Sequence, residues 1–140
     1  MKIFLMEDDV ILNEIIEEHL ISKGHDVYTA FNGDEAEDIL YNKVFDLLLL
    51  DVNVPGTTGF ELLDELRQKN IHTPAIFITS LHAVDDIEKG FESGCHDYIK
   101  KPFELKELDL RINNIKKIFK IESDNNINVI NGISIDKENL

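Results

Sequence analysis

Short segments rich in apolar and β-branched residues alternate along the chain with longer amphipathic segments. The short segments are predicted to be buried strands and cover residues 2–6, 26–30, 46–50, 75–78 and 97–100. The longer segments repeat apolar residues every three or four positions, which predicts helices, and cover residues 9–23, 34–42, 58–69, 85–93 and 104–120. This alternation predicts an α/β fold with a parallel sheet covered on both faces, in the doubly wound topology that right-handed crossovers favour.

Side chains with useful chemistry follow the predicted strands at their C-terminal ends. In a doubly wound sheet, the ligand site lies outside these ends, at the switch in strand order. The polar residues that this rule selects are Glu7, Asp8, Asp51, Thr79 and Lys101. Carboxylates that lie close together repel each other unless a cation or a proton joins them. The pattern therefore predicts a metal-assisted phosphoryl acceptor.

The composition limits the classes of function. The chain has 140 residues, which fits one domain with a short extension, and its net charge of −14 disfavours nucleic-acid binding by this segment. The single cysteine, Cys95, excludes an internal disulfide and is expected to be a small buried side chain, as suits a reducing compartment. No segment has the roughly 20 apolar residues of a membrane span, and the first residues do not form a signal peptide. We expect a cytoplasmic protein with no membrane partner.

The C-terminal residues follow a different pattern. Residues 122–126 are polar and are expected to form a linker. Two short β-prone runs then flank Asn131-Gly132, which is a strong signal for a β-hairpin. A lone hairpin is marginally stable in water. We therefore expect residues 127–140 to be the truncated start of a second domain.

Four motifs carry a resemblance to a known family. They are Met6-Glu7-Asp8-Asp9, Leu50-Asp51-Val52-Asn53-Val54-Pro55-Gly56 with Gly59, Ile78-Thr79-Ser80, and Asp97-Tyr98-Ile99-Lys100-Lys101-Pro102-Phe103. In this order and at strand ends, they resemble the receiver domain of bacterial two-component response regulators over about residues 1–121. The hairpin is similar to the first strands of an OmpR/PhoB-like winged-helix output domain. The resemblance implies a flavodoxin-like (βα)5 fold with a five-stranded parallel sheet in the order 2-1-3-4-5.

The resemblance also implies a site for phosphoryl transfer. Asp51 is the implied phosphoacceptor, whose carboxylate forms an aspartyl phosphate. The implied ligands of Mg²⁺ are Glu7, Asp8, Asp51 and the backbone carbonyl of Asn53, with Glu7 acting through a water. Lys101, rather than Lys100, and the Thr79 hydroxyl are implied partners of the phosphoryl oxygens. Asp9 is an alternative acidic ligand, although we expect it to cap the helix at 9–23.

The implied switch changes the surface formed by the helix at 85–93, the strand at 97–100 and the helix at 104–120. The Thr79 hydroxyl moves towards the phosphoryl group, and the Tyr98 ring fills the space that it leaves. In OmpR/PhoB-like relatives this surface forms a homodimer, for which Asp97, Glu107 and Arg111 stand at matching positions. Asp109 departs from the pattern because a small apolar residue is common there. The implied partners are a sensor histidine kinase, a second copy of the chain, and DNA only through the output domain.

Other functions are less compatible with the sequence. A haloacid-dehalogenase-like phosphatase needs a second aspartate where Asn53 stands. A flavodoxin-like cofactor binder needs a loop that cradles phosphate, which Asp8-Asp9 would repel. The five histidines lack the spacing of zinc ligands. We therefore expect a regulatory domain, not an enzyme, that promotes its own phosphorylation and dephosphorylation, and a degenerate receiver that acts only as an interaction module stays the alternative.

Overall fold

Five parallel strands form the central sheet of the computed structural model, which describes residues 1–81 and 84–121. The strands are β1 (Lys2–Met6), β2 (Asp26–Ala30), β3 (Leu47–Leu50), β4 (Ala75–Thr79) and β5 (Asp97–Lys100). Their order in the sheet is β2-β1-β3-β4-β5, as the family resemblance implied. The chain therefore has the expected five-stranded, flavodoxin-like parallel sheet.

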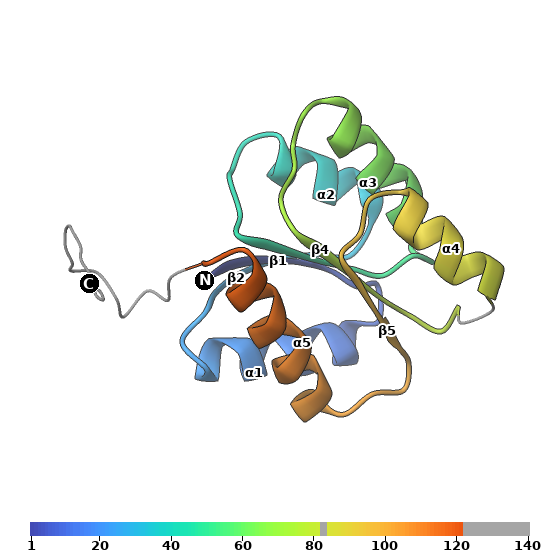
Figure 1. Cartoon of the computed structure of the whole chain (residues 1–140). Coiled ribbons are helices and arrows are strands. Elements are labelled where there is room, and N and C mark those ends of the chain that lie inside the picture. The colour runs from blue at the N-terminus through green and yellow to red at the C-terminus, as the bar shows by residue number, and fades with distance from the viewer. Residues whose placement is uncertain (82–83, 122–140) are drawn as a thin grey trace, which may run out of the picture.

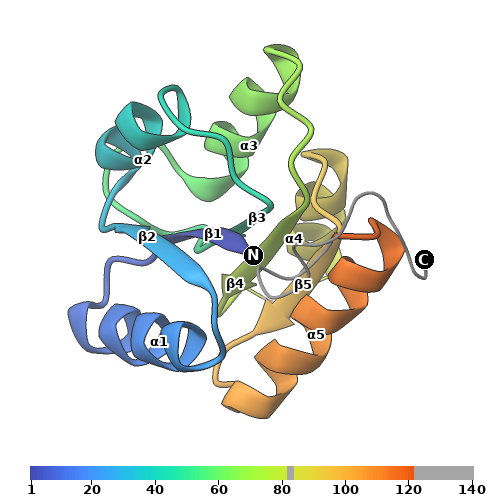
Figure 2. The ribbon, with the colours of Figure 1, turned by 90° about the vertical axis from the view of Figure 1, so that its left-hand side faces the viewer.

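Helices cover both faces of this sheet (Figures 1 and 2). They are α1 (Val10–Ser22), α2 (Gly33–Leu40), α3 (Gly59–Gln68), α4 (Val84–Glu92) and α5 (Leu105–Ile118). Helices α2, α3 and α4 lie on one face of the sheet, and α1 and α5 lie on the other (Figure 1). Within residues 1–81 and 84–121, no helix is long and apolar enough to cross a membrane. The predicted linker and hairpin lie outside the described residues.

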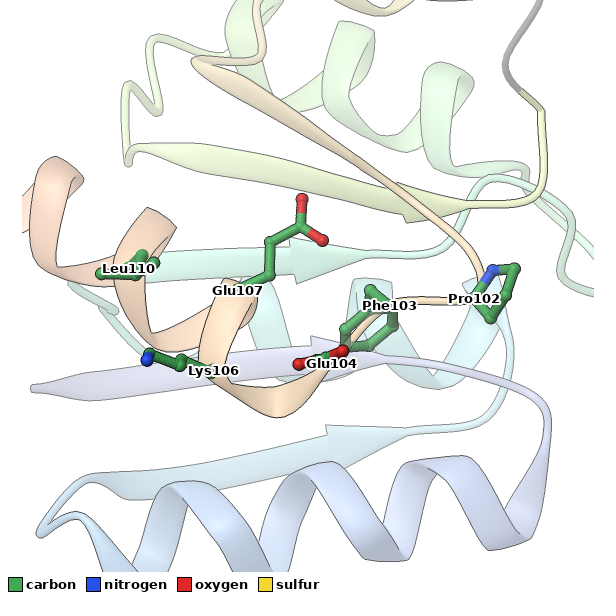
Figure 3. A pocket seen from close by; sticks show the side chains of 6 residues that line it. All are labelled: Pro102, Phe103, Glu104, Lys106, Glu107 and Leu110. Atoms are coloured by element: carbon green, nitrogen blue, oxygen red, sulfur yellow. The ribbon is translucent and has the colours of Figure 1, made fainter.

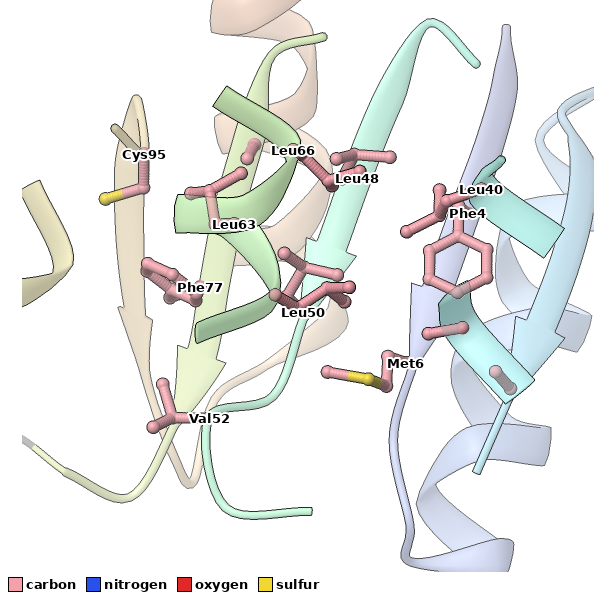
Figure 4. Close-up of a cluster of buried hydrophobic side chains, with 14 of the residues drawn as sticks. Phe4, Met6, Leu40, Leu48, Leu50, Val52, Leu63, Leu66, Phe77 and Cys95 are labelled. Carbon is pink, nitrogen blue, oxygen red and sulfur yellow. The ribbon is translucent and has the colours of Figure 1, made fainter. Parts of the chain in front are cut away.

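The core consists of two layers because side chains alternate between the faces of a strand. In β3, Leu48 and Leu50 belong to the layer beneath α2 and α3, whereas Leu47 and Leu49 belong to the layer beneath α1 and α5. Figure 4 shows part of the first layer, in which Leu48 and Leu50 lie among residues of β1, α3 and β4. Full burial of a leucine contributes about 1.5–3 kcal/mol. A continuous apolar run is therefore required at the centre of the sheet.

The ends of the helices follow capping residues more closely than the apolar pattern. Asp9 is the N-cap of α1, as predicted, and its side chain accepts hydrogen bonds from the N–H groups of Ile11 and Leu12. Thr58 and Glu61 form a capping box at the start of α3. The predicted helix at 58–69 was one residue too long at each end because residues 58 and 69 are caps.

Candidate functional site

Three carboxylates meet at the C-terminal edge of the sheet. Strands β1 and β3 are paired so that Met6 lies opposite Leu50, and the residues that follow these two leave the sheet side by side. The N–H of Asp51 donates to the carbonyl of Met6 at 2.9 Å. Glu7, Asp8 and Asp51 each offer one carboxylate oxygen, and these oxygens lie within 4.8 Å of one another. This donor set fits a hard divalent cation, which prefers oxygen ligands.

Lys101 supplies a positive charge to the same cluster. Its Nζ lies 2.7 Å from Oε1 of Glu7 and 2.9 Å from Oδ2 of Asp51. The Lys101–Pro102 peptide bond is cis. Lys100, the competing candidate, is exposed. The geometry thus favours Lys101 as the lysine that contacts the carboxylates.

Burial shapes the electrostatics of this cluster. Glu7 is 1% exposed, and desolvation raises its pKa to about 7 although Lys101 and the N–H of Asp9 donate hydrogen bonds to its carboxylate. Burial alone would lower the pKa of Lys101, but its hydrogen bonds to Glu7 and Asp51 outweigh burial and raise it. Lys101 therefore contacts two of the three clustered carboxyl groups, Glu7 and Asp51.

The backbone around Asp51 is tightly packed. The N–H of Asn53 donates to Oδ1 of Asp51 at 3.3 Å, while the Asn53 side chain itself is exposed. A Cβ at Gly59 would lie 2.5 Å from the carbonyl oxygen of Asp51, so only glycine allows α3 to begin this close. The start of α3 therefore fixes the backbone of Asp51.

Thr79 lies at the end of β4, where its side chain is fully buried. Its Oγ1 accepts a hydrogen bond of 3.3 Å from the N–H of Leu81, and its carbonyl accepts one of 2.9 Å from the N–H of Lys101. Thr79 thus joins the Lys101 backbone to the segment that leads towards α4.

Tyr98 is half-buried on β5 and contacts the same segment. Its hydroxyl donates to the carbonyl of Leu81. Desolvation raises the pKa of Tyr98 to about 12, so the hydroxyl stays a neutral donor. A Cβ at Gly90 of α4 would lie 3.2 Å from the rings of both Phe77 and Tyr98. The ring is therefore held between Phe77, Leu81 and α4.

The predicted dimer residues contact one another within a single chain. Arg111 lies 3.4 Å from Asp97 and 3.6 Å from Glu107, and it is exposed. Asp109, which the sequence associated with the dimer surface, instead pairs with His19 of α1 at 2.8 Å. Contacts between two copies stay a prediction.

Sequence reasoning missed Asn13. This residue of α1 is 1% exposed, and its Nδ2 donates to the backbone carbonyl of Glu7 at 3.0 Å. The available signal was a polar residue beside the apolar face formed by Leu12, Ile16 and Leu20.

A hollow of about 600 Å³ near the start of α5 is distinct from the carboxylate cluster (Figure 3). It is lined by Pro102, Phe103, Glu104, Lys106, Glu107 and Leu110. None of the three clustered carboxylates lines it. The candidate site is therefore the polar edge of the sheet, not this hollow.

Curated proteins similar to this chain include transcriptional regulatory proteins. It is 46% identical over 112 residues to the transcriptional regulatory protein CrdR of Helicobacter pylori, covering 79% of this chain and 53% of that protein. It is 41% identical over 116 residues to the transcriptional regulatory protein CiaR of Streptococcus pneumoniae, covering 83% of this chain and 51% of that protein. The chain thus spans about half the length of the curated relatives it matches.

Solved structures show the same fold. The receiver domain of the Francisella response regulator 1452 matches with a TM-score of 0.80 and 32% identity, covering 84% of this chain and 98% of that chain. The BeF3-activated DrrB receiver domain matches with a TM-score of 0.76 and 28% identity, covering 83% of this chain and 97% of that chain. The family model for the response regulator receiver domain matches residues 3–113. The chain therefore belongs to the response regulator receiver domain family.

Proposed function

We propose that this receiver domain accepts a phosphoryl group on Asp51 from a sensor histidine kinase and controls transcription through an attached output domain. The observation that carries the proposal is the carboxylate cluster with an ammonium group inside it. Asp51 is 5% exposed, its carboxylate lies with those of Glu7 and Asp8 within 4.8 Å, and the Nζ of Lys101 lies 2.9 Å away. Phosphoryl transfer depends mainly on such positioning and charge neutralisation.

The proposed metal ligands are the carboxylates of Glu7, Asp8 and Asp51 with the backbone carbonyl of Asn53. These residues would hold Mg²⁺, which would supply positive charge to the cluster and to one phosphoryl oxygen. The carboxylate oxygen of Asp51 attacks the phosphorus atom of a phosphohistidine. The P–N bond breaks, and the imidazole nitrogen keeps the electron pair. No proton needs to leave Asp51, because the nucleophile is already a carboxylate.

Lys101 and Thr79 are the proposed partners of the transferred group. The ammonium of Lys101 already contacts Asp51, so it is placed to pair with a phosphoryl oxygen that develops there. The Thr79 hydroxyl, which accepts from the N–H of Leu81, is the proposed donor to another oxygen. The same proposal assigns the loss of the phosphoryl group to water that the exposed side chain of Asn53 orients near Asp51.

The proposed switch follows from the hydrogen bonds of Leu81. The N–H of Leu81 donates to Thr79, and the carbonyl of Leu81 accepts from Tyr98. A movement of Thr79 towards the phosphoryl group therefore changes both contacts. The altered packing then changes the α4-β5-α5 surface. Asp97, Glu107 and Arg111 of this surface are the proposed contacts of a homodimer, and DNA binding is assigned to the output domain.

The test is mass spectrometry after incubation with acetyl phosphate and Mg²⁺. The wild type is expected to gain one phosphoryl group, Asp51→Asn is expected to gain none, and chelation of the metal should prevent labelling of the wild type. Asp38→Asn, at an exposed position of α2, is the matched control and should label normally. A wild type that does not label would contradict the proposal and favour a degenerate receiver that acts as an interaction module.

A further inference from the structure

We infer that Asn13 is a positioning residue of α1. It holds the acidic loop, residues 7–9, in the geometry that binds the divalent cation. The inference rests on the proposed function, because it assigns a role towards the same metal site. Asn13 is not itself a proposed ligand. It acts on the backbone from which Glu7 and Asp8 extend.

The burial of Asn13 is unusual for an amide side chain. Asn13 is 1% exposed, and the buried polar or charged residues among the described residues are Glu7, Asn13, Asp51, Thr79 and Ser93. Three of these belong to the candidate site. Since buried polar groups are retained where they make hydrogen bonds, the contacts of Asn13 indicate what it does.

The side-chain amide of Asn13 joins the ends of two strands. Its Nδ2 donates to the carbonyl of Glu7 at 3.0 Å and to the carbonyl of Ala30 at 3.4 Å. The N–H of Glu7 also donates to the carbonyl of Ala30 at 3.1 Å. The backbone of Glu7 is thus held by β2 through its N–H and by α1 through its carbonyl.

The other end of the acidic loop is held by the helix cap. Oδ1 of Asp9 accepts from the N–H groups of Ile11 and Leu12, and the N–H of Asp9 donates to Oε2 of Glu7 at 3.1 Å. Asp8 lies between these two anchors and is exposed. Its backbone direction therefore depends on both the cap and Asn13.

Asparagine is suited to this place because it donates two N–H groups without adding charge. A leucine of similar size donates none, so both carbonyls would lose a hydrogen bond in a buried environment. The loop would then shift to find other donors, and the carboxylates of Glu7 and Asp8 would move with it. Partners that orient metal ligands commonly change metal affinity about 10–100-fold when they are replaced.

The decisive experiment measures Mg²⁺ binding by calorimetry, without phosphorylation. Asn13→Leu is expected to weaken Mg²⁺ binding by about 10-fold, and Asn13→Ser, which keeps one hydroxyl donor, should fall between Asn13→Leu and the wild type. Ile16→Ala is the matched control, because Ile16 is fully buried on the same helix and packs in the core layer beneath α1 and α5. Ile16→Ala should lower the melting temperature and leave the Mg²⁺ affinity within about twofold.

Phosphorylation kinetics provide the second measurement. With acetyl phosphate, Asn13→Leu should need more Mg²⁺ for half-maximal labelling while its maximal rate stays close to that of the wild type. If Asn13→Leu lowers the melting temperature but binds Mg²⁺ as the wild type does, Asn13 is merely structural and the inference fails while the proposed function stands. If the wild type itself binds no Mg²⁺, both are overturned. A wild type that binds Mg²⁺ but does not label overturns only the proposed function.

Discussion

The buried carboxyl group of Glu7 should make the stability of the metal-free protein fall as the pH rises. Its pKa in the folded protein is about 7, compared with 4.5 for the free side chain. The folded state therefore binds this proton more tightly than the unfolded state does. Stability from this group is complete below about pH 4.5 and is lost as the pH approaches the folded pKa of about 7.

The magnitude follows from the size of the pKa difference. One pKa unit corresponds to about 1.4 kcal/mol, so a rise from 4.5 to about 7 corresponds to about 3 kcal/mol. Glu7 is 1% exposed, so water screens little of this effect. Glu7→Gln keeps the shape of the side chain and removes its titration. The free energy of unfolding of Glu7→Gln, relative to that of the wild type, should therefore rise by about 3 kcal/mol as the pH increases from about 4.5 to about 8.

Urea unfolding in the presence of a chelator provides the measurement. The free energy of unfolding is determined for the wild type and Glu7→Gln at about pH 5 and about pH 8. The difference in free energy of unfolding between the wild type and Glu7→Gln is compared at the two pH values. Titration of other groups largely cancels in this difference. Mg²⁺ at about pH 8 should restore the wild type and have little effect on the variant. Glu14→Gln, at an exposed position on α1, should match the wild type at both pH values. A difference between the wild type and Glu7→Gln that does not change with pH would refute the reasoning.

Three further predictions concern single side chains. Asn53→Met should slow the loss of the phosphoryl group from Asp51, measured as phosphoprotein remaining over time, and an unchanged rate would rule out a role for the Asn53 side chain. Asp9→Ala should lower the free energy of unfolding by about 1 kcal/mol through loss of the cap of α1, whereas Asp9→Asn should retain most of it in urea titrations; equal losses in the two variants would contradict this. Tyr98→Phe removes the hydrogen bond to Leu81. It should label with acetyl phosphate at the normal rate, but phosphorylation should cause smaller NMR chemical-shift changes on α4 and β5 than in the wild type. Changes as large as those of the wild type would exclude a role for the hydroxyl in the switch.

The helices and strands were predictable because their signals are local, whereas the strand order came from the family resemblance. The run Leu47–Leu50 is apolar at every position because β3 has a covered layer on both faces. The helix ends were less accurate, since the N-cap residues Asp9, Asn32 and Thr58 have extended backbone and precede the first helical residue. Residue 33 begins α2, one position before the predicted start at 34, because Asn32 is the N-cap.

The supporting contacts of the site were not predictable in the same way. The strand-end rule selected Glu7, Asp8 and Asp51, which the structure brings together. The hydrogen bond between His19 and Asp109 joins residues 90 positions apart, and no local pattern specifies which helix faces which. The bridge from Asn13 to Ala30 likewise depends on how α1 lies across two strands. Such contacts follow from tertiary packing, which a periodic pattern does not determine.

At Gly90, the backbone of α4 packs closely against the rings of Phe77 and Tyr98. Even one methyl group there would lie 3.2 Å from Phe77 and Tyr98, tighter than ordinary van der Waals contact. In the proposed switch, a rotation of the Tyr98 ring would therefore change its contact with α4. The orientation of one phenol ring would then alter the position of a helix at the protein surface.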